Sequence, residues 1–91
     1  MDRMKVELLH IGFSGVVAAN RILAVASPSS APIKRLIRTA NERGLIVNMT
    51  HGRKTKSAII LDSGHVVLAA LQPETIASRL HQQREKMPKD A

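Results

Sequence analysis

The fold of this 91-residue chain is indicated first by the stretch Leu45–Leu61, which reads LIVNMTHGRKTKSAIIL. Two apolar runs typical of β-strands, Leu45–Thr50 and Ser57–Leu61, lie on either side of a polar segment that contains a glycine. This pattern predicts a β-hairpin whose turn is the segment 51–56. The turn carries three cations within four residues and no acid before Asp62, so we expect it to present positive charge to a polyanion.

The charge of the chain is concentrated around this turn. There are 14 Lys and Arg against 7 Asp and Glu, which gives a formal net charge of +7. The segment 34–56 holds seven cations and one acid, Glu42, so it supplies six of the seven net charges. Such clustering favours nucleic acid as the partner, with an acidic membrane surface, an acidic protein or a merely solubilising surface as alternatives. The cations are Lys34, Arg35, Arg38, Arg43, Arg53, Lys54 and Lys56.

Further strands are predicted on both sides of the opening stretch. They are Val6–Ile11, Ile22–Ala26 and the continuously apolar run His65–Leu71. Val16–Ala19 is a shorter segment that could also pair as a strand. Asn20 and Arg21 interrupt two of these runs and predict a bend or bulge. A strand that is apolar on both faces must be covered on both. One helix covers one face of His65–Leu71, so we expect a partner subunit on the other.

Two helices complete the expected fold. The longer one has Ser30 as a capping residue, Pro32 in its first turn and Gly44 as the residue that ends it. A shorter C-terminal helix opens at Pro73. We therefore expect an α+β domain with an antiparallel sheet of four to five strands, one main amphipathic helix and a short C-terminal helix. The apolar face of the main helix consists of Ile33, Leu36, Ile37 and Ala40.

Length and composition set the remaining bounds. The chain is expected to form one domain, residues 1–82, followed by a frayed tail, 83–91. A domain of this size buries only about 60–65 % of its unfolded surface, so self-association is an expected way of burying more. There is no cysteine, and the four histidines are too far apart for a local zinc spacing, so we expect no metal or other cofactor.

The sequence also predicts a location. No segment approaches the ~20 apolar residues that span a bilayer. The N-terminus does not resemble a signal peptide. We therefore expect a cytoplasmic protein with no membrane partner.

Four residues are the candidate contacts with nucleic acid. Arg53, Lys54 and Lys56 lie in the basic turn, where the alternative is a solubilising tip that deters edge aggregation. Arg21 is the fourth, and its alternative role is a solvated bulge. The stripe Lys34, Arg35 and Arg38 is the exposed side of a helix or, less commonly, a phosphate-contacting one.

The scarcity of aromatic residues and the lack of paired acids limit the functions that the chain is expected to have. Phe13 is the only aromatic residue, and readers of single-stranded nucleic acid stack bases on aromatic platforms, so duplex contact fits better. The acids are scattered with no paired-carboxylate spacing, and the Ser63 and His65 pair suits a turn better than a nucleophile and base. We expect neither an enzyme nor a small-molecule substrate.

Short motifs throughout the chain resemble the RemA family, small bacterial regulators linked to extracellular-matrix genes. The similarity covers roughly residues 5–80. The motifs are Ile11-Gly12-Phe13, Ala19-Asn20-Arg21, Ser27-Pro28, Ser30-Ala31-Pro32-Ile33-Lys34-Arg35, Arg43-Gly44, Gly52-Arg53, Asp62-Ser63, His65-Val66 and Gln72-Pro73-Glu74-Thr75.

The resemblance implies a nucleoid-associated transcriptional regulator that binds double-stranded DNA as a ring of identical subunits and controls biofilm matrix genes. It assigns DNA contact to Arg21 and Arg53. Lys54 and Lys56 stand where arginine is familiar, and lysine keeps the charge but loses the bidentate fork. The resemblance also matches Pro32 to a proline that is associated with the integrity of proteins in the family. The alternatives are a basic scaffold that docks an acidic protein and, less favoured, an RNA-binding protein.

Overall fold

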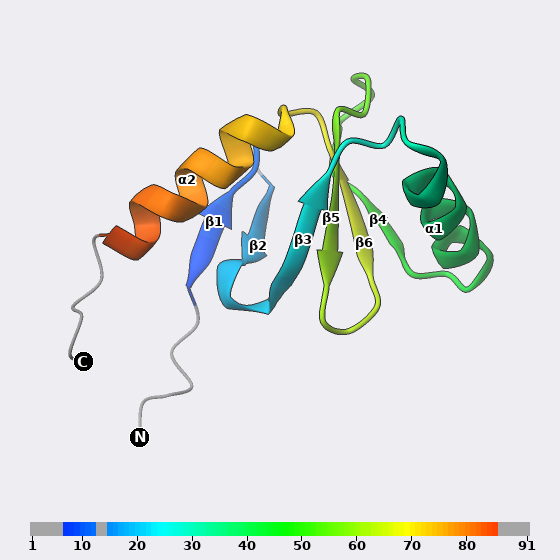
Figure 1. The fold of residues 1–91 in the computed structure, drawn as a ribbon, viewed down its shortest axis with the longest axis horizontal. Coiled ribbons are helices and arrows are strands. Elements are labelled where there is room, and N and C mark those ends of the chain that lie inside the picture. The colour runs from blue at the N-terminus through cyan, green and yellow to red at the C-terminus, as the bar shows by residue number, and fades with distance from the viewer. Residues whose placement is uncertain (1–6, 13–14, 86–91) are drawn as a thin grey trace.

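The computed structural model describes residues 7–12 and 15–85, which form an α+β fold (Figure 1). The predicted fold class is confirmed, with two helices among the described residues. The elements are β1 (Leu8–His10), β2 (Val16–Ala18), the 3₁₀ turn η2 (Ala19–Arg21), β3 (Ile22–Ala26), α1 (Ala31–Glu42), β4 (Ile46–Asn48), β5 (Ser57–Leu61), β6 (Val66–Ala69) and α2 (Pro73–Glu85).

Four of the described strands form the main sheet, in the order β3-β5-β6-β4, and β1 and β2 form a separate ribbon. The β3–β5 and β5–β6 pairs are antiparallel, whereas β4 runs parallel to β6. The sheet is therefore mixed rather than wholly antiparallel. The β5–β6 hairpin closes through Asp62–Gly64, where Gly64 has a φ of +92° that the tight turn requires.

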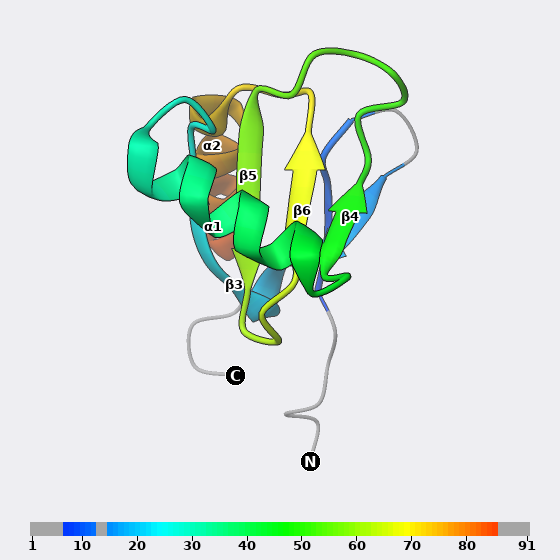
Figure 2. The ribbon, with the colours of Figure 1, turned by 90° about the vertical axis from the view of Figure 1, so that its right-hand side faces the viewer.

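The predicted hairpin between Leu45–Thr50 and Ser57–Leu61 is wrong, because β6 lies between β4 and β5. A strand has only two edges for pairing. Those of β5 are taken by β3 and β6, so β4 pairs with the outer edge of β6 instead. The segment 49–56 is consequently a crossover that arches past the C-terminal end of β6 (Figures 1 and 2).

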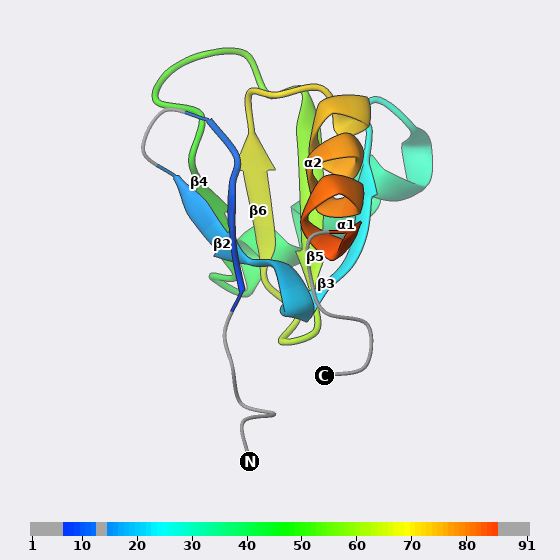
Figure 3. The same ribbon diagram turned by 90° about the vertical axis from the view of Figure 1, so that its left-hand side faces the viewer.

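The two faces of the main sheet are covered by different elements of the same chain. Helix α1 lies against one face (Figure 2), and α2 and the β1–β2 ribbon lie against the other (Figure 3). On the α1 side Ala40 packs with Ala58 and Val66. On the other side the fully buried Ile76 of α2 packs with Ile59. The expectation that a partner subunit covers the second face of His65–Leu71 is therefore wrong.

The ends of α1 only partly follow the sequence prediction. Ser30 occupies the N-cap position, but its hydroxyl makes no capping hydrogen bond, which corrects the expected role of that side chain. Pro32 lies in the first turn as predicted. Gly44 has a φ of +72°, and the N–H of Leu45 donates to the carbonyl of Ala40 at 2.8 Å. This bond reaches back five residues, as in the Schellman ending that a glycine permits.

Other predictions concern the ends of the chain. Helix α2 continues past His81 to Glu85, and it is one residue longer than α1 rather than the short helix that the sequence predicts. Val6, Phe13 and residues 86–91 lie outside the described residues, and with them the part of the predicted tail beyond Glu85. No helix in the described part of the chain is both long and apolar enough to cross a membrane.

Candidate nucleic-acid interface

The basic crossover loop, residues 49–56, begins with a tight turn. The N–H of Arg53 donates to the carbonyl of Thr50 at 3.0 Å, and the two residues between them, His51 and Gly52, both have positive φ. Positive φ at both central positions is the feature of a type I′ turn. The side chain of Asn48 accepts hydrogen bonds from the N–H and the hydroxyl of Thr50, at 3.0 and 2.7 Å. The local turn that the sequence predicts therefore forms, although the strands around it do not pair.

Both ends of this loop are fixed to the end of β6. The N–H of Met49 donates to the carbonyl of Leu68 at 2.9 Å, and the N–H of Lys56 donates to that of Ala69 at 2.8 Å. The hydroxyl of Ser57, which is fully buried, donates to the carbonyl of Leu71. The loop is thus a short arch with two rigid supports.

The three cations of the loop lie together on its exposed side. Arg53, Lys54 and Lys56 are all exposed and, with Ala70 and Leu71, line an open cavity of about 320 Å³. The structure therefore brings these three predicted site residues together. Several cations around one open concavity form a site for an anion such as a phosphate group.

Replacing Ser57 by alanine is expected to destabilise the fold by about 1–2 kcal/mol, because the part-buried hydrogen bond to the carbonyl of Leu71 would lose its donor. Urea unfolding of both proteins measures the difference. Ser78→Ala, a change at an exposed position of α2, serves as the matched control and should stay within about 0.5 kcal/mol of wild type. A Ser57→Ala protein as stable as this control would show that the hydroxyl does not support the loop.

Arg21, the fourth predicted contact, lies on the 3₁₀ turn η2 just before β3. The sequence predicts a bend or bulge here, and the structure has both: the turn itself and a register shift between Ile22 and Ala24. The Nε of Arg21 lies 3.2 Å from Oδ2 of Asp62, and the carbonyl of Arg21 accepts from the N–H of Asp62 at 2.9 Å. The side chain of Arg21 is 60 % exposed.

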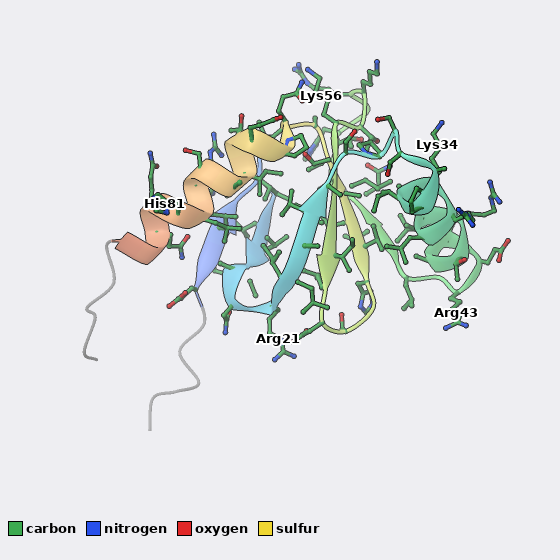
Figure 4. The ribbon with its side chains drawn as sticks, in the orientation of Figure 1. Arg21, Lys34, Arg43, Lys56 and His81 are labelled. Atoms are coloured by element: carbon green, nitrogen blue, oxygen red, sulfur yellow. The ribbon has the colours of Figure 1, made fainter. Side chains whose placement is uncertain are left out.

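Arg21 and the loop lie at opposite ends of the sheet (Figure 4). Lys56 precedes β5 and Asp62 follows it. At about 3.3 Å per residue, six residues separate these ends by about 20 Å. The structure therefore does not bring Arg21 together with Arg53, Lys54 and Lys56 within one chain. A single chain carries its four candidate contacts at two separate ends rather than in one patch.

The cations of α1 lie on the helix that covers one face of the sheet (Figure 2). Lys34, Arg35 and Arg38 are exposed, as expected for the polar side of an amphipathic helix. Lys34 lies at the end of the molecule where the loop is, and Arg43 lies at the end where Arg21 is (Figure 4). No group of three or more His, Cys, Asp and Glu within residues 7–12 and 15–85 is placed to hold a metal ion.

Sequence reasoning missed Asp62 as the partner of Arg21. The two residues are 41 positions apart, and the β3–β5 pairing of Ile22 with Leu61 makes them neighbours. The usable signal was the pair of opposite charges, each adjacent to the end of a predicted strand. That signal gains meaning only once the register of the two strands is known.

Comparison with known proteins shows the family to which the chain belongs. Residues 8–80, which include all four candidate contacts, match the family described as RemA-like, extracellular matrix regulatory protein A-like. The chain belongs to this RemA-like family. The resemblance inferred from its motifs is thereby confirmed, and the match runs from β1 into α2.

Relatives of this RemA-like protein carry names that state a regulatory role. A regulatory protein of Clostridium perfringens strain SM101 is 49 % identical over 87 residues, covering 96 % of this chain and 98 % of the relative. One from Dehalococcoides mccartyi strain BAV1 is 57 % identical over 77 residues, with 85 % and 80 % covered. One from Halothermothrix orenii is 56 % identical over 77 residues, with 85 % and 92 % covered. The RemA-like chain is accordingly similar to regulatory proteins over most of its length.

Proposed function

We propose that this RemA-like regulator controls transcription by binding duplex DNA as a ring-like homo-oligomer. The observation that carries the proposal is the basic crossover loop, in which Arg53, Lys54 and Lys56 are exposed on an arch fixed at both ends. A rigid support lowers the entropy lost when these side chains bind phosphates. Arg21 supplies a second contact from the other end of the sheet.

The chemistry of the cations favours contacts to DNA phosphates over contacts that recognise the base sequence. Lys54 and Lys56 present point charges, which suit phosphate oxygens, whereas Arg53 and Arg21 carry the planar fork that can also bind a guanine edge. The two ends of one chain are about 20 Å apart, which corresponds to about six base-pair steps of duplex. One protomer can thus contact phosphates about half a turn of duplex apart.

Self-association supplies the affinity that one protomer lacks. Two or three phosphate contacts bind weakly, and repeating them around a ring raises the effective concentration of each further contact. Two features of the described surface support a partner copy. Leu8 and Leu23 are large apolar side chains that are 57 % and 69 % exposed, and β3 and β4 each have an edge with no paired neighbour in the described chain.

The family and its named relatives support the regulatory side of the proposal. The description of the family, extracellular matrix regulatory protein A-like, supports matrix genes of a bacterial biofilm as the targets. The regulatory names of the relatives support a binding role rather than catalysis. A DNA partner would put the protein at the nucleoid, in the cytoplasm.

Binding to duplex DNA is expected to weaken at least about 100-fold when salt is raised from 50 to 200 mM. Four cations of one protomer on four phosphates give a slope of log K against log salt near −3.6, because each neutralised phosphate contributes about −0.9, and each further protomer on the duplex makes the slope steeper. Fluorescence anisotropy of a labelled random duplex measures the slope, with light scattering on the same sample to give the oligomeric state. A slope near zero would exclude phosphate contact, and a clean monomer would exclude the ring.

The same measurement separates the alternatives. Equal amounts of duplex DNA, single-stranded RNA and an acidic polypeptide compete for the protein at each salt concentration. Duplex DNA should bind best. Preference for the polypeptide would identify a protein-docking scaffold, and preference for RNA would identify an RNA-binding protein.

A further inference from the structure

The contact between Arg21 and Asp62 involves both the backbone and the side chain of the arginine. The carbonyl of Arg21 accepts a hydrogen bond from the N–H of Asp62 at 2.9 Å. The carboxylate of Asp62 lies 3.2 Å from Nε of the same arginine. The turn that closes the β5–β6 hairpin therefore holds Arg21 at two points, one at the chain and one along the side chain.

The position of this contact on the guanidinium group determines which nitrogens of Arg21 stay accessible to a ligand. The ion pair is made at Nε, which is the inner nitrogen of the group. The two terminal nitrogens, Nη1 and Nη2, carry the donors that form an end-on fork to a phosphate or to a guanine edge. Arg21 extends from the end of the sheet (Figure 4), and its side chain is 60 % exposed. The contact with Asp62 thus orients the arginine while leaving its outer donors accessible.

We propose that Asp62 is a positioning residue that aims the terminal nitrogens of Arg21 at duplex DNA. The proposal rests on the proposed function, because it assumes that Arg21 contacts DNA. A free arginine side chain loses considerable rotamer entropy when it is immobilised on a ligand. Asp62 reduces this loss by restricting the side chain before DNA arrives.

The direction in which DNA affinity changes when Asp62 is removed distinguishes a positioning role from an effect of net charge. Removing Asp62 raises the formal net charge from +7 to +8, counted over the whole chain. A more positive protein should bind DNA more tightly if charge alone matters. If Asp62 positions Arg21, removing it should instead weaken binding. Net charge cannot explain weaker binding to a polyanion after an acidic residue is removed.

The test compares Asp62→Ala with Glu42→Ala, using a labelled random duplex and fluorescence anisotropy at 50 mM salt. Glu42 is exposed at the C-terminal end of α1, so its removal changes the charge by the same amount without touching Arg21. Asp62→Ala is expected to weaken binding by about two- to tenfold, as for the release of one ordered side chain. Glu42→Ala is expected to bind as wild type or more tightly.

Two further variants make the role specific to Arg21. In an Arg21→Ala background, adding Asp62→Ala should no longer weaken binding, because there is no side chain left to orient. Asp62→Asn keeps an acceptor for Nε while removing the same charge, so it should bind more tightly than Asp62→Ala. Light scattering and thermal unfolding confirm that each variant keeps the oligomeric state and the fold.

A measurement without DNA checks the contact itself. In the nitrogen–proton NMR spectrum, the Nε–H of Arg21 should exchange slowly with water in the wild type and quickly in Asp62→Ala.

The outcomes separate the two proposals. If Arg21→Ala weakens DNA binding and Asp62→Ala does not, the positioning role is overturned while the proposed function stands. If the wild type does not bind duplex DNA at 50 mM salt, the proposed function is wrong and the positioning role falls with it.

Discussion

Replacing Arg53, Lys54 and Lys56 together by alanine is expected to weaken binding to duplex DNA about 100-fold at 0.15 M salt. Each phosphate contact contributes about 0.9 log units of affinity per tenfold dilution of salt, and 0.15 M lies about 0.8 log units below 1 M. For one protomer on the duplex, three lost contacts thus remove about two log units. The slope of log K against log salt should also fall in magnitude by about 2.7 for each protomer on the duplex. Anisotropy titrations at several salt concentrations measure both quantities.

The matched control removes the same charge from a different place. Lys34, Arg35 and Arg38 are exposed on α1, so their triple alanine variant has the same net charge as the loop variant. It should bind DNA clearly more tightly than the loop variant, because those side chains lie on a helix face rather than around the open cavity. Equal losses in the two variants would mean that net charge, and not the arch, determines affinity.

Replacing Ile76 by alanine is expected to reduce the free energy of unfolding by about 3–4 kcal/mol. Ile76 is fully buried and belongs to the cluster that joins α2 to the sheet, with Ile59 and Val67. The loss includes the transfer of the deleted methyl groups and the cavity that they leave. A domain of this length has a total stability of about 5–14 kcal/mol, so the variant approaches the limit of folding.

Urea unfolding followed by circular dichroism measures this loss as a lower midpoint. Ile76→Val is the graded control, since it deletes one methylene and should cost about 1 kcal/mol. A loss below 1 kcal/mol for Ile76→Ala would show that α2 is not anchored through this side chain. The expected result would confirm that the chain covers the second face of its own sheet.

The helices could be predicted because their signals are local. Pro32 and Gly44 act on the backbone within one turn of their own positions, and both lie where the sequence places them. The pairing of strands is a different problem. The turn at His51 and Gly52 forms as its residues indicate, yet the strand after it pairs elsewhere, because β3 and β6 occupy both edges of β5. Competition between strands that are distant in sequence is not visible in a short pattern.

The site was predictable to the same extent. Arg53, Lys54 and Lys56 are close together in the sequence and stay together in space. The position of Arg21 relative to them follows from the length of β5, and its contact with Asp62 follows from the β3–β5 register. Neither could be obtained without the topology. The sequence therefore predicted which residues carry charge, and the fold determined that they lie at two separate ends.

The way the crossover loop is attached has an evolutionary consequence. Its supports at the end of β6 are the backbone hydrogen bonds of Met49 and Lys56 and the hydroxyl of Ser57, and none of them uses the charged group of Lys54 or Lys56. Exchanging lysine for arginine on the arch therefore leaves these supports in place. Under the proposed function, such exchanges would change how strongly a family member binds DNA, and how well it discriminates sequences, without changing how the loop is held.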